Sequence, residues 1–189
     1  MDKIEIVIVT GMSGAGKTTA MAAFENMAYR CIDNYPIELL GAFSEYLKDN
    51  TGYPRIAMAV SLGDAPKAIR FLSNVDWLNV SVIFLDCDDN IILKRYKETR
   101  RSHPLADFVP DRSVEKAVKK EKELMGILKA HSDYVIDTTY MSLKQLRERV
   151  TGLFSTSITD SMKVTVMSFG FKYGIPLEAD IVFDARCLI

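Results

Sequence analysis

The feature that most constrains the fold is a glycine-rich segment at residues 11–18, GMSGAGKT, which lies between an apolar run and a helix-forming run. Residues 4–10 (IEIVIVT) are apolar and mostly β-branched, which predicts a buried strand. The segment matches the pattern G-x-x-x-x-G-K-[ST], and a strand before it with a helix after it is the context in which that pattern binds phosphate. A glycine-rich turn that only packs a helix on a sheet would not need the Lys-Thr pair.

Each residue type in this segment predicts a contact with phosphate or metal. Glycines let backbone N–H groups approach a phosphate, and a helix that begins near Gly16 adds its positive N-terminal end. Lys17 is predicted to contact the β- and γ-phosphates, and the Thr18 hydroxyl to bind Mg²⁺. The predicted nucleotide-binding residues are Gly11, Met12, Ser13, Gly14, Ala15, Gly16, Lys17, Thr18 and Thr19. The expected ligands are therefore ATP or GTP with Mg²⁺.

Strand-like and helix-like runs alternate through the rest of the first 155 residues. Further strands are expected at 29–33, 55–62, 80–86 and 133–138, with helical patterns between them. This order predicts an α/β P-loop NTPase fold of the small-kinase type, with a parallel five-stranded sheet and helices on both faces.

The pattern changes after residue 155. We expect residues 1–155 to form the nucleotide-binding domain and the small polar residues 156–161 to form a linker. Residues 162–189 contain two strand-like runs with no helix between them, which predicts the β-hairpin that starts a truncated second domain.

Three aspartates are candidates for the metal side of the site. Asp86 follows an apolar strand, as the acid of a Walker B strand does, but that strand is the fourth and its helix leads to the predicted lid. In small P-loop kinases the acid belongs to the third strand, so Asp33 or Asp64 would then face the magnesium and Asp86 would mark a helix start. Asp33 is ranked first because it ends the second strand, at the edge where open α/β sheets bind ligands.

Basic residues at the end of the helix predicted at 88–101 form a second candidate site. Arg100 and Arg101 precede a loop and could close over a γ-phosphate as a lid. His103 fits a surface position at least as well as a functional one. On the next helix, lysines alternate with acids, which predicts a solvated face; they are Lys116, Lys119, Lys120 and Lys122 with Glu115, Glu121 and Glu123.

Composition excludes several classes of function. The 189 residues carry a formal net charge of −1, so overall charge does not favour nucleic acid or an anionic membrane. The three cysteines are widely spaced without a C-x-x-C pattern, which argues against a zinc site or a disulfide framework. The N-terminal apolar run is too short to span a membrane and no signal cleavage pattern follows it, so we expect a cytoplasmic protein without membrane contact.

The chain resembles the RapZ/YvcJ family of P-loop nucleotide-binding proteins over essentially all of its length. The resemblance rests on five segments in the family's order: GMSGAGKT, CIDNYP, YKETRRSHPL, DYVIDTTYMS and SFGFKYGIPLEADIVFDARCL. It implies a small-kinase-like fold, hydrolysis of ATP and GTP, and, as in some members, action as an RNase adaptor. Family members have an Asp-x-Arg-[Asn/Gly] motif, taken as a GTP site, where this chain has Gly63-Asp64-Ala65-Pro66, with the arginine missing and the aspartate shifted.

The resemblance also bears on partners. The family's second domain begins at the SFGF segment, and this chain ends soon after Arg186. If a regulatory protein or RNA partner binds through that domain, we therefore expect this chain to lack the binding site.

Three functions are compatible with these residues. The favoured hypothesis is a weak nucleoside triphosphatase that acts as a regulatory nucleotide-sensing domain, with Lys17, Thr18, Asp33, Arg100 and Arg101 at the site. The second is a small-molecule kinase in which Asp33 activates an acceptor held near residues 33–47, although this segment contains no arginine to bind an anionic acceptor. The third is an RNA- or protein-binding adaptor whose nucleotide site is only structural.

Overall fold

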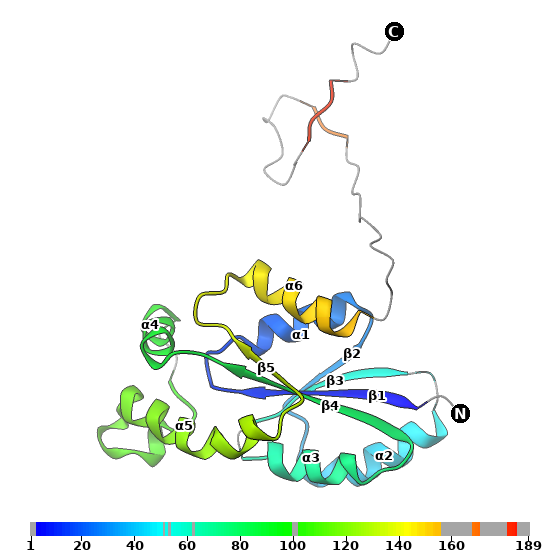
Figure 1. The fold of residues 1–189 in the computed structure, drawn as a ribbon, viewed down its shortest axis with the longest axis horizontal. Helices are drawn as coiled ribbons and strands as arrows, with labels where there is room; N and C mark the ends of the chain where they lie inside the picture. Colours follow the sequence, from blue (N-terminus) through cyan, green and yellow to red (C-terminus); the bar gives the residue numbers. More distant parts are fainter. Residues whose placement is uncertain are drawn as a thin grey trace. The chain divides into compact units, whose positions relative to one another are not determined.

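A parallel sheet lies between two layers of helices in the computed structural model, which describes residues 3–50, 52, 54–61, 63–99, 102–155, 168–170 and 181–184 (Figure 1). The five strands have the order β2-β3-β1-β4-β5. They are β1 (Ile4–Gly11), β2 (Arg30–Asp33), β3 (Arg55–Ala59), β4 (Leu78–Asp86) and β5 (Tyr134–Asp137). All neighbouring pairs are parallel, so the carboxyl ends of the strands meet at one edge of the sheet. The predicted five-stranded parallel sheet is confirmed.

The position of β1 defines where a ligand would bind. β3 pairs with one side of β1 and β4 with the other. The chain therefore crosses over β1 between β3 and β4, and open α/β sheets bind ligands beyond the carboxyl ends of the strands at such a crossover. The glycine-rich segment begins at this point, because its first residue, Gly11, is the last residue of β1.

Helices cover the sheet on both faces, as predicted, and the described residues contain six of them. They are α1 (Lys17–Asn26), α2 (Leu40–Asp49), α3 (Ala65–Ser73), α4 (Asp89–Thr99), α5 (Val114–Ala130) and α6 (Leu143–Phe154). Figure 1 shows α1 and α6 on one face and α2, α3 and α5 on the other, with α4 beyond the carboxyl end of β4. Short 3₁₀ turns occur at Ile37–Leu39, Ala106–Phe108 and Pro110–Arg112.

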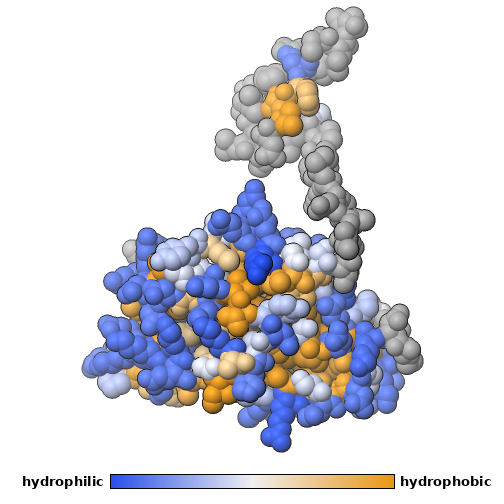
Figure 2. All heavy atoms as spheres, viewed as in Figure 1, coloured by the Kyte–Doolittle hydropathy of each residue, from blue (hydrophilic) through white to orange (hydrophobic). Residues whose placement is uncertain are grey.

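The core explains the composition of β1. Its residues Ile6, Val7, Ile8 and Val9 are all fully buried. Helices cover both faces of the sheet, so neither face of this central strand meets water between Ile6 and Val9, and these four residues are all apolar instead of alternating. Figure 2 shows hydrophilic residues over the outer helices and hydrophobic residues reaching the surface between the two helix layers.

One predicted strand ends early for a local reason. The strand expected at 55–62 ends at Ala59. After Ala59, the Ser61 carbonyl accepts from Ala65 N–H and the Ser61 hydroxyl donates to Asp64, so the chain has already turned toward α3.

The chain divides into two units, Met1–Ser155 and Thr156–Ile189. Within the predicted hairpin, the structure describes residues 168–170 and 181–184, and these seven residues have no regular secondary structure. The other residues of that hairpin, and the predicted linker 156–161, lie outside the described residues.

Among the residues that the structure describes, no helix combines the length and the apolar character needed to cross a membrane.

The backbone at the end of β1 requires glycine. Gly11 has φ +130°, and a Cβ built on it would lie 2.2 Å from the carbonyl oxygen of Leu85 on β4. Neither strand can move away without breaking its ladder, because Gly11 pairs directly with Leu85.

This predicts a large effect of Gly11→Ala on stability. We expect the free energy of unfolding to fall by about 3 kcal/mol or more, since the substitution combines a backbone clash with a strained φ. Gly126→Ala is the control, because Gly126 lies inside α5 with open space around it, and we expect it to raise stability by roughly 0.5–1 kcal/mol. Urea unfolding followed by circular dichroism measures both values, and equal stability of the two variants would contradict the packing of β1 on β4.

Candidate functional site

Lys17 lies at the base of the glycine-rich loop, as the first residue of α1. Its Nζ donates to the carbonyl oxygens of Gly11 at 2.7 Å and Met12 at 3.1 Å. Gly16, with φ +107°, turns the loop into the helix, and a Cβ there would lie 2.8 Å from Leu146 Cδ2 of α6. The ammonium group and the N-terminal end of α1 therefore face the same space, and both favour an anion there.

The electrostatic surroundings of Lys17 are mixed. Burial lowers the pKa of Lys17, and the nearby negative charges of Glu121 and Asp33 oppose that effect. The sequence predicts Asp33 beside this lysine but gives Glu121 no such role. Two carboxylates and one ammonium thus meet at the end of the loop.

A cavity of about 560 Å³ opens beside Lys17. Ser13, Lys17, Asp33 and Glu121 contribute polar groups to its lining. Its remaining wall is mostly apolar and includes Pro104, Leu105, Leu124 and Leu128. A cleft of this size with a few convergent polar groups is typical of a small-molecule site.

The structure corrects the prediction for Glu121 and decides between the two alternatives for His103. Glu121 was predicted on a solvated helix face, and His103 fitted a surface position at least as well as a functional one, yet each residue is only 2% exposed. The Glu121 carboxylate accepts hydrogen bonds from Ser13 N–H at 3.0 Å, from the Ser13 hydroxyl at 2.7 Å and from His103 Nε2 at 3.1 Å. The other acids and lysines of that predicted face are exposed, namely Glu115, Lys116, Lys119, Lys120, Lys122 and Glu123.

The helical spacing of apolar residues in α5 could have indicated that Glu121 is buried. Ala117 and Met125, four residues before and after it, are buried on the same face of α5. A carboxylate at the centre of an apolar i, i+4 row is a candidate buried group. Its partner Ser13 is 108 residues away, so spacing alone could not identify the contact.

The environment of Glu121 favours its ionised form. Burial by itself would raise the pKa of Glu121, but hydrogen bonds from His103 and Ser13 outweigh burial and lower the pKa below its usual value. The carboxylate therefore carries a full negative charge beside the loop.

The opposite side of the loop is held by residues from α4 and the end of β5. Arg95 donates to the carbonyl oxygens of Gly14 and Thr138, both at 2.9 Å. The buried Thr138 hydroxyl donates to the carbonyl oxygen of Ala15 at 2.9 Å. Three consecutive loop residues, Ser13 to Ala15, are thus each bonded to a different distant element. Neither Arg95 nor Thr138 was assigned to the site from the sequence.

The three candidate aspartates lie in different surroundings. Asp33 is exposed at the end of β2 and lines the Lys17 cavity. Asp64 accepts from the Ser61 hydroxyl at 2.8 Å and borders a separate cavity of about 230 Å³.

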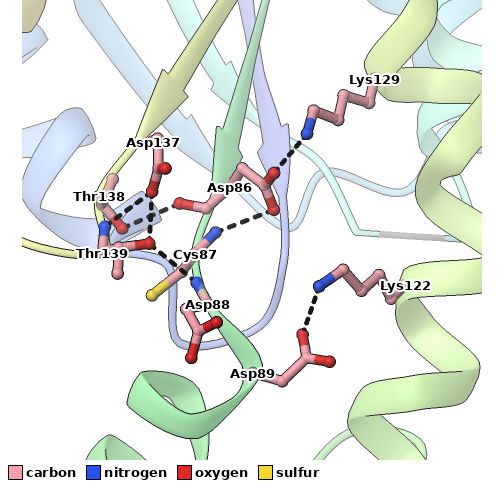
Figure 3. A network of polar contacts seen from close by, with 9 residues as sticks. All are labelled: Asp86, Cys87, Asp88, Asp89, Lys122, Lys129, Asp137, Thr138 and Thr139. Carbon is pink, nitrogen blue, oxygen red and sulfur yellow. Dashed lines mark hydrogen bonds and ion pairs between the residues drawn. The ribbon is translucent and has the colours of Figure 1, made fainter.

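Asp86 belongs to a polar network at the carboxyl ends of β4 and β5 (Figure 3). Its carboxylate accepts from Cys87 N–H at 2.9 Å and pairs with Lys129 Nζ at 2.5 Å. Asp88, and not Asp86, caps α4, because the Asp88 carboxylate accepts a hydrogen bond from Asn90 N–H. Asp86 does not line the cavity that contains Lys17 and Asp33.

The remaining predicted site residues have varied positions. Met12 and Ala15 are buried, Thr18 is exposed, and Thr19 is half-buried on α1. The predicted lid residues, Arg100 and Arg101, lie outside the described residues.

The residues at the loop fit Mg²⁺ bound together with phosphate. Across the described part of the chain, no group of three or more His, Cys, Asp or Glu side chains could hold a metal. Mg²⁺ usually binds one or two protein groups together with phosphate oxygens and waters. The exposed Thr18 hydroxyl and one carboxylate provide such a set.

Comparison with known proteins gives the family. Residues 4–158 match the RapZ-like N-terminal domain, and residues 162–189 match the RapZ C-terminal domain. A nucleotide-binding protein of Listeria welshimeri is 43% identical over 192 aligned residues, which cover 98% of this chain and 65% of that protein. A nucleotide-binding protein of Bacillus cereus is 44% identical over 98% of this chain and 64% of its own length. The chain thus spans about 65% of the length of these relatives.

Solved structures show the fold. Shikimate kinase from Acinetobacter baumannii superposes with a TM-score of 0.56 at 19% identity, over 83% of this chain and 97% of that one. Shikimate kinase from Bacteroides thetaiotaomicron gives a TM-score of 0.55 at 15% identity, over 79% and 98%. The chain has the fold of P-loop kinases, which confirms the predicted fold class.

The lowered pKa of Glu121 predicts how stability depends on pH. In the folded protein the pKa of Glu121 lies below its usual value of 4.5. Stabilisation by the ionised carboxylate is therefore complete above pH 4.5 and is lost as the pH falls through the lowered pKa. We expect the difference in melting temperature between wild type and Glu121→Gln to be largest at neutral pH and to shrink as the pH falls below 4.5 and through the lowered pKa. Glu123→Gln changes an exposed carboxylate of the same helix and is the control. A difference that stays constant over this range would show that Glu121 is not ionised.

Proposed function

We propose, from the premise that this chain belongs to the RapZ-like N-terminal domain family, that it binds a nucleoside triphosphate with Mg²⁺ and hydrolyses it slowly. The observation that carries the proposal is the position of Lys17 Nζ, held by the carbonyl oxygens of Gly11 and Met12 beside a cavity of about 560 Å³. A P-loop lysine in that position contacts the β- and γ-phosphates. The family relatives are named nucleotide-binding proteins.

Each residue of the site has a role in this proposal. The backbone N–H groups of residues 11–18 would bind the phosphates, and Lys17 would neutralise charge at their γ end. Thr18 and Asp33 would hold Mg²⁺, Asp33 through the water shell, and bound Mg²⁺ would supply positive charge to the phosphate oxygens. Arg100 and Arg101 would close over the γ-phosphate. Either ATP or GTP satisfies these contacts, because none involves the base.

Solvent access is the reason to propose slow turnover. Thr18 and Asp33 are both exposed. Electrostatic stabilisation of a transition state is strongest where water is excluded, so an open site gains less from its charges. Slow turnover suits a domain that senses nucleotide and passes the signal to a partner.

A second candidate, a small-molecule kinase, is favoured by one further observation. A cavity of about 420 Å³ is lined by Arg30, Asp33, Tyr35 and Phe43, among others. Asp33 thus borders both this cavity and that of Lys17, where a base for an acceptor hydroxyl would lie. Although the segment 33–47 contains no arginine, Arg30 from β2 provides one. Release of inorganic phosphate from ATP without any acceptor supports hydrolysis. Formation of ADP and a phosphorylated acceptor, only when the acceptor is present, supports the kinase.

The nucleotide site predicts a specific effect of Lys17→Ala. We expect this variant to lose measurable binding of ATP and GTP while it stays folded, because the substitution removes a phosphate ligand and leaves the strand and helix on either side of the loop in place. Lys119→Ala, on the exposed face of α5, is the control and should bind as wild type does. Titration with a fluorescent nucleotide measures both. Unchanged affinity in Lys17→Ala would exclude the proposed phosphate site.

The metal-side role of Asp33 predicts a difference between two aspartates. We expect Asp33→Asn to lower phosphate release from ATP by on the order of 100-fold, and Asp86→Asn to lower it much less. Circular dichroism checks that both variants are folded, since Asp86 pairs with Lys129 and its replacement affects stability. A larger loss of turnover in Asp86→Asn would assign the metal to β4 instead.

A further inference from the structure

The contacts of Glu121 join three separate parts of the chain. The carboxylate lies on α5, the Ser13 groups that it accepts from belong to the glycine-rich loop, and His103 belongs to the loop that follows α4. Both oxygens are used, because Oε1 accepts from the Ser13 hydroxyl and Oε2 from Ser13 N–H and His103 Nε2. The proposed function gives Glu121 and His103 no role.

The hydrogen bonds around His103 have a defined direction. Its Nδ1 accepts from Leu105 N–H at 3.1 Å, so the ring proton must lie on Nε2. His103 therefore donates to Glu121, which is an acceptor in all three of its hydrogen bonds. An ionised carboxylate with three donors forms strong, directional contacts.

The same contacts fix a wall of the cavity. Pro104 and Leu105 line the Lys17 cavity directly after His103 in the chain. The His103 ring also packs against Tyr96 of α4, with centroids 5.2 Å apart. Glu121 thus sets the position of Ser13 on one side of the cavity and, through His103, that of Pro104 and Leu105 on another.

Stability alone does not explain an acid at this position. A buried carboxylate pays a desolvation penalty, and an apolar residue of similar size on the row of Ala117 and Met125 would avoid it. The negative charge also lies near Lys17, where it weakens the attraction of that ammonium for phosphate. A group that carries a desolvation penalty and opposes Lys17, yet is bonded to two atoms of Ser13, points to a requirement for the shape of the loop.

We infer that Glu121 and His103 are positioning residues of the nucleotide site, which hold the loop at Ser13 and the adjoining cavity wall in the conformation that binds nucleotide. This inference rests on the proposed function. Neither residue needs to touch the reacting atoms. Loss of the contact therefore weakens binding of both the diphosphate and the triphosphate, in molecules that remain folded.

The experiment measures the affinity of the full chain for Mg·ADP and Mg·ATP, together with its melting temperature. We expect Glu121→Gln and His103→Leu to weaken binding of both nucleotides by roughly tenfold, the loss expected for a charge-assisted hydrogen bond. His103→Gln can still donate to Glu121 and should retain most of the affinity. Glu123→Gln changes an exposed acid of α5 and should have no effect.

A double-mutant cycle separates positioning from general destabilisation. Ser13→Ala removes one of the donors, and we expect the Ser13→Ala, Glu121→Gln double variant to bind no more weakly than Glu121→Gln alone, because both changes break the same contact. If Glu121→Gln does not fold, the comparison of His103→Leu with His103→Gln decides the matter.

Failure of this inference and failure of the proposed function would give different results. Wild-type affinity in Glu121→Gln and His103→Leu, with a lowered melting temperature, would overturn this inference and leave the proposed function standing. Absence of nucleotide binding in the wild-type chain would overturn the proposed function, and this inference with it.

Discussion

The close approach of β1 to β4 at Gly11 is the contact on which the candidate site depends. No side chain fits between Gly11 and Leu85, and Met12 N–H donates to the Leu85 carbonyl oxygen at 3.0 Å as the chain leaves the sheet. The loop therefore begins at a fixed point and in a fixed direction. Lys17 can then reach back to the carbonyl oxygens of Gly11 and Met12, because the start of α1 lies over the end of β1.

Distant elements hold the rest of the loop. Glu121 of α5 binds Ser13, Arg95 of α4 binds Gly14, and Thr138 after β5 binds Ala15. Glu121 and Arg95 are charged and the Thr138 contact is buried, so each contact is worth more than a hydrogen bond between exposed neutral groups. A loop of small residues, which would be mobile by itself, is thereby held in one conformation before any ligand binds, and preorganisation of this kind reduces the entropy lost on binding.

The sequence predicts local features well and long-range contacts poorly. The strand, turn and helix around residues 11–18 follow from a local pattern, and alternating runs predict the parallel sheet, because both depend on neighbours in the chain. Glu121 was predicted on the surface, because a run of alternating charges predicts a solvated helix face unless the helical period is followed residue by residue. His103 lies in a loop, where no period separates a surface position from a functional one. Thr138 and Arg95 show no pattern at all, since their roles arise only when β5 and α4 meet the loop in space.

The most direct test of the site is a crystal structure of this chain with a non-hydrolysable ATP analogue and Mg²⁺. It should show the β- and γ-phosphates against the N–H groups of residues 11–18 and Lys17, with the metal on the Thr18 hydroxyl and Asp33 closer to it than Asp86. In that structure Asp86 should still pair with Lys129. Nucleotide bound away from the loop, or Asp86 released from Lys129 to approach the metal, would contradict this account.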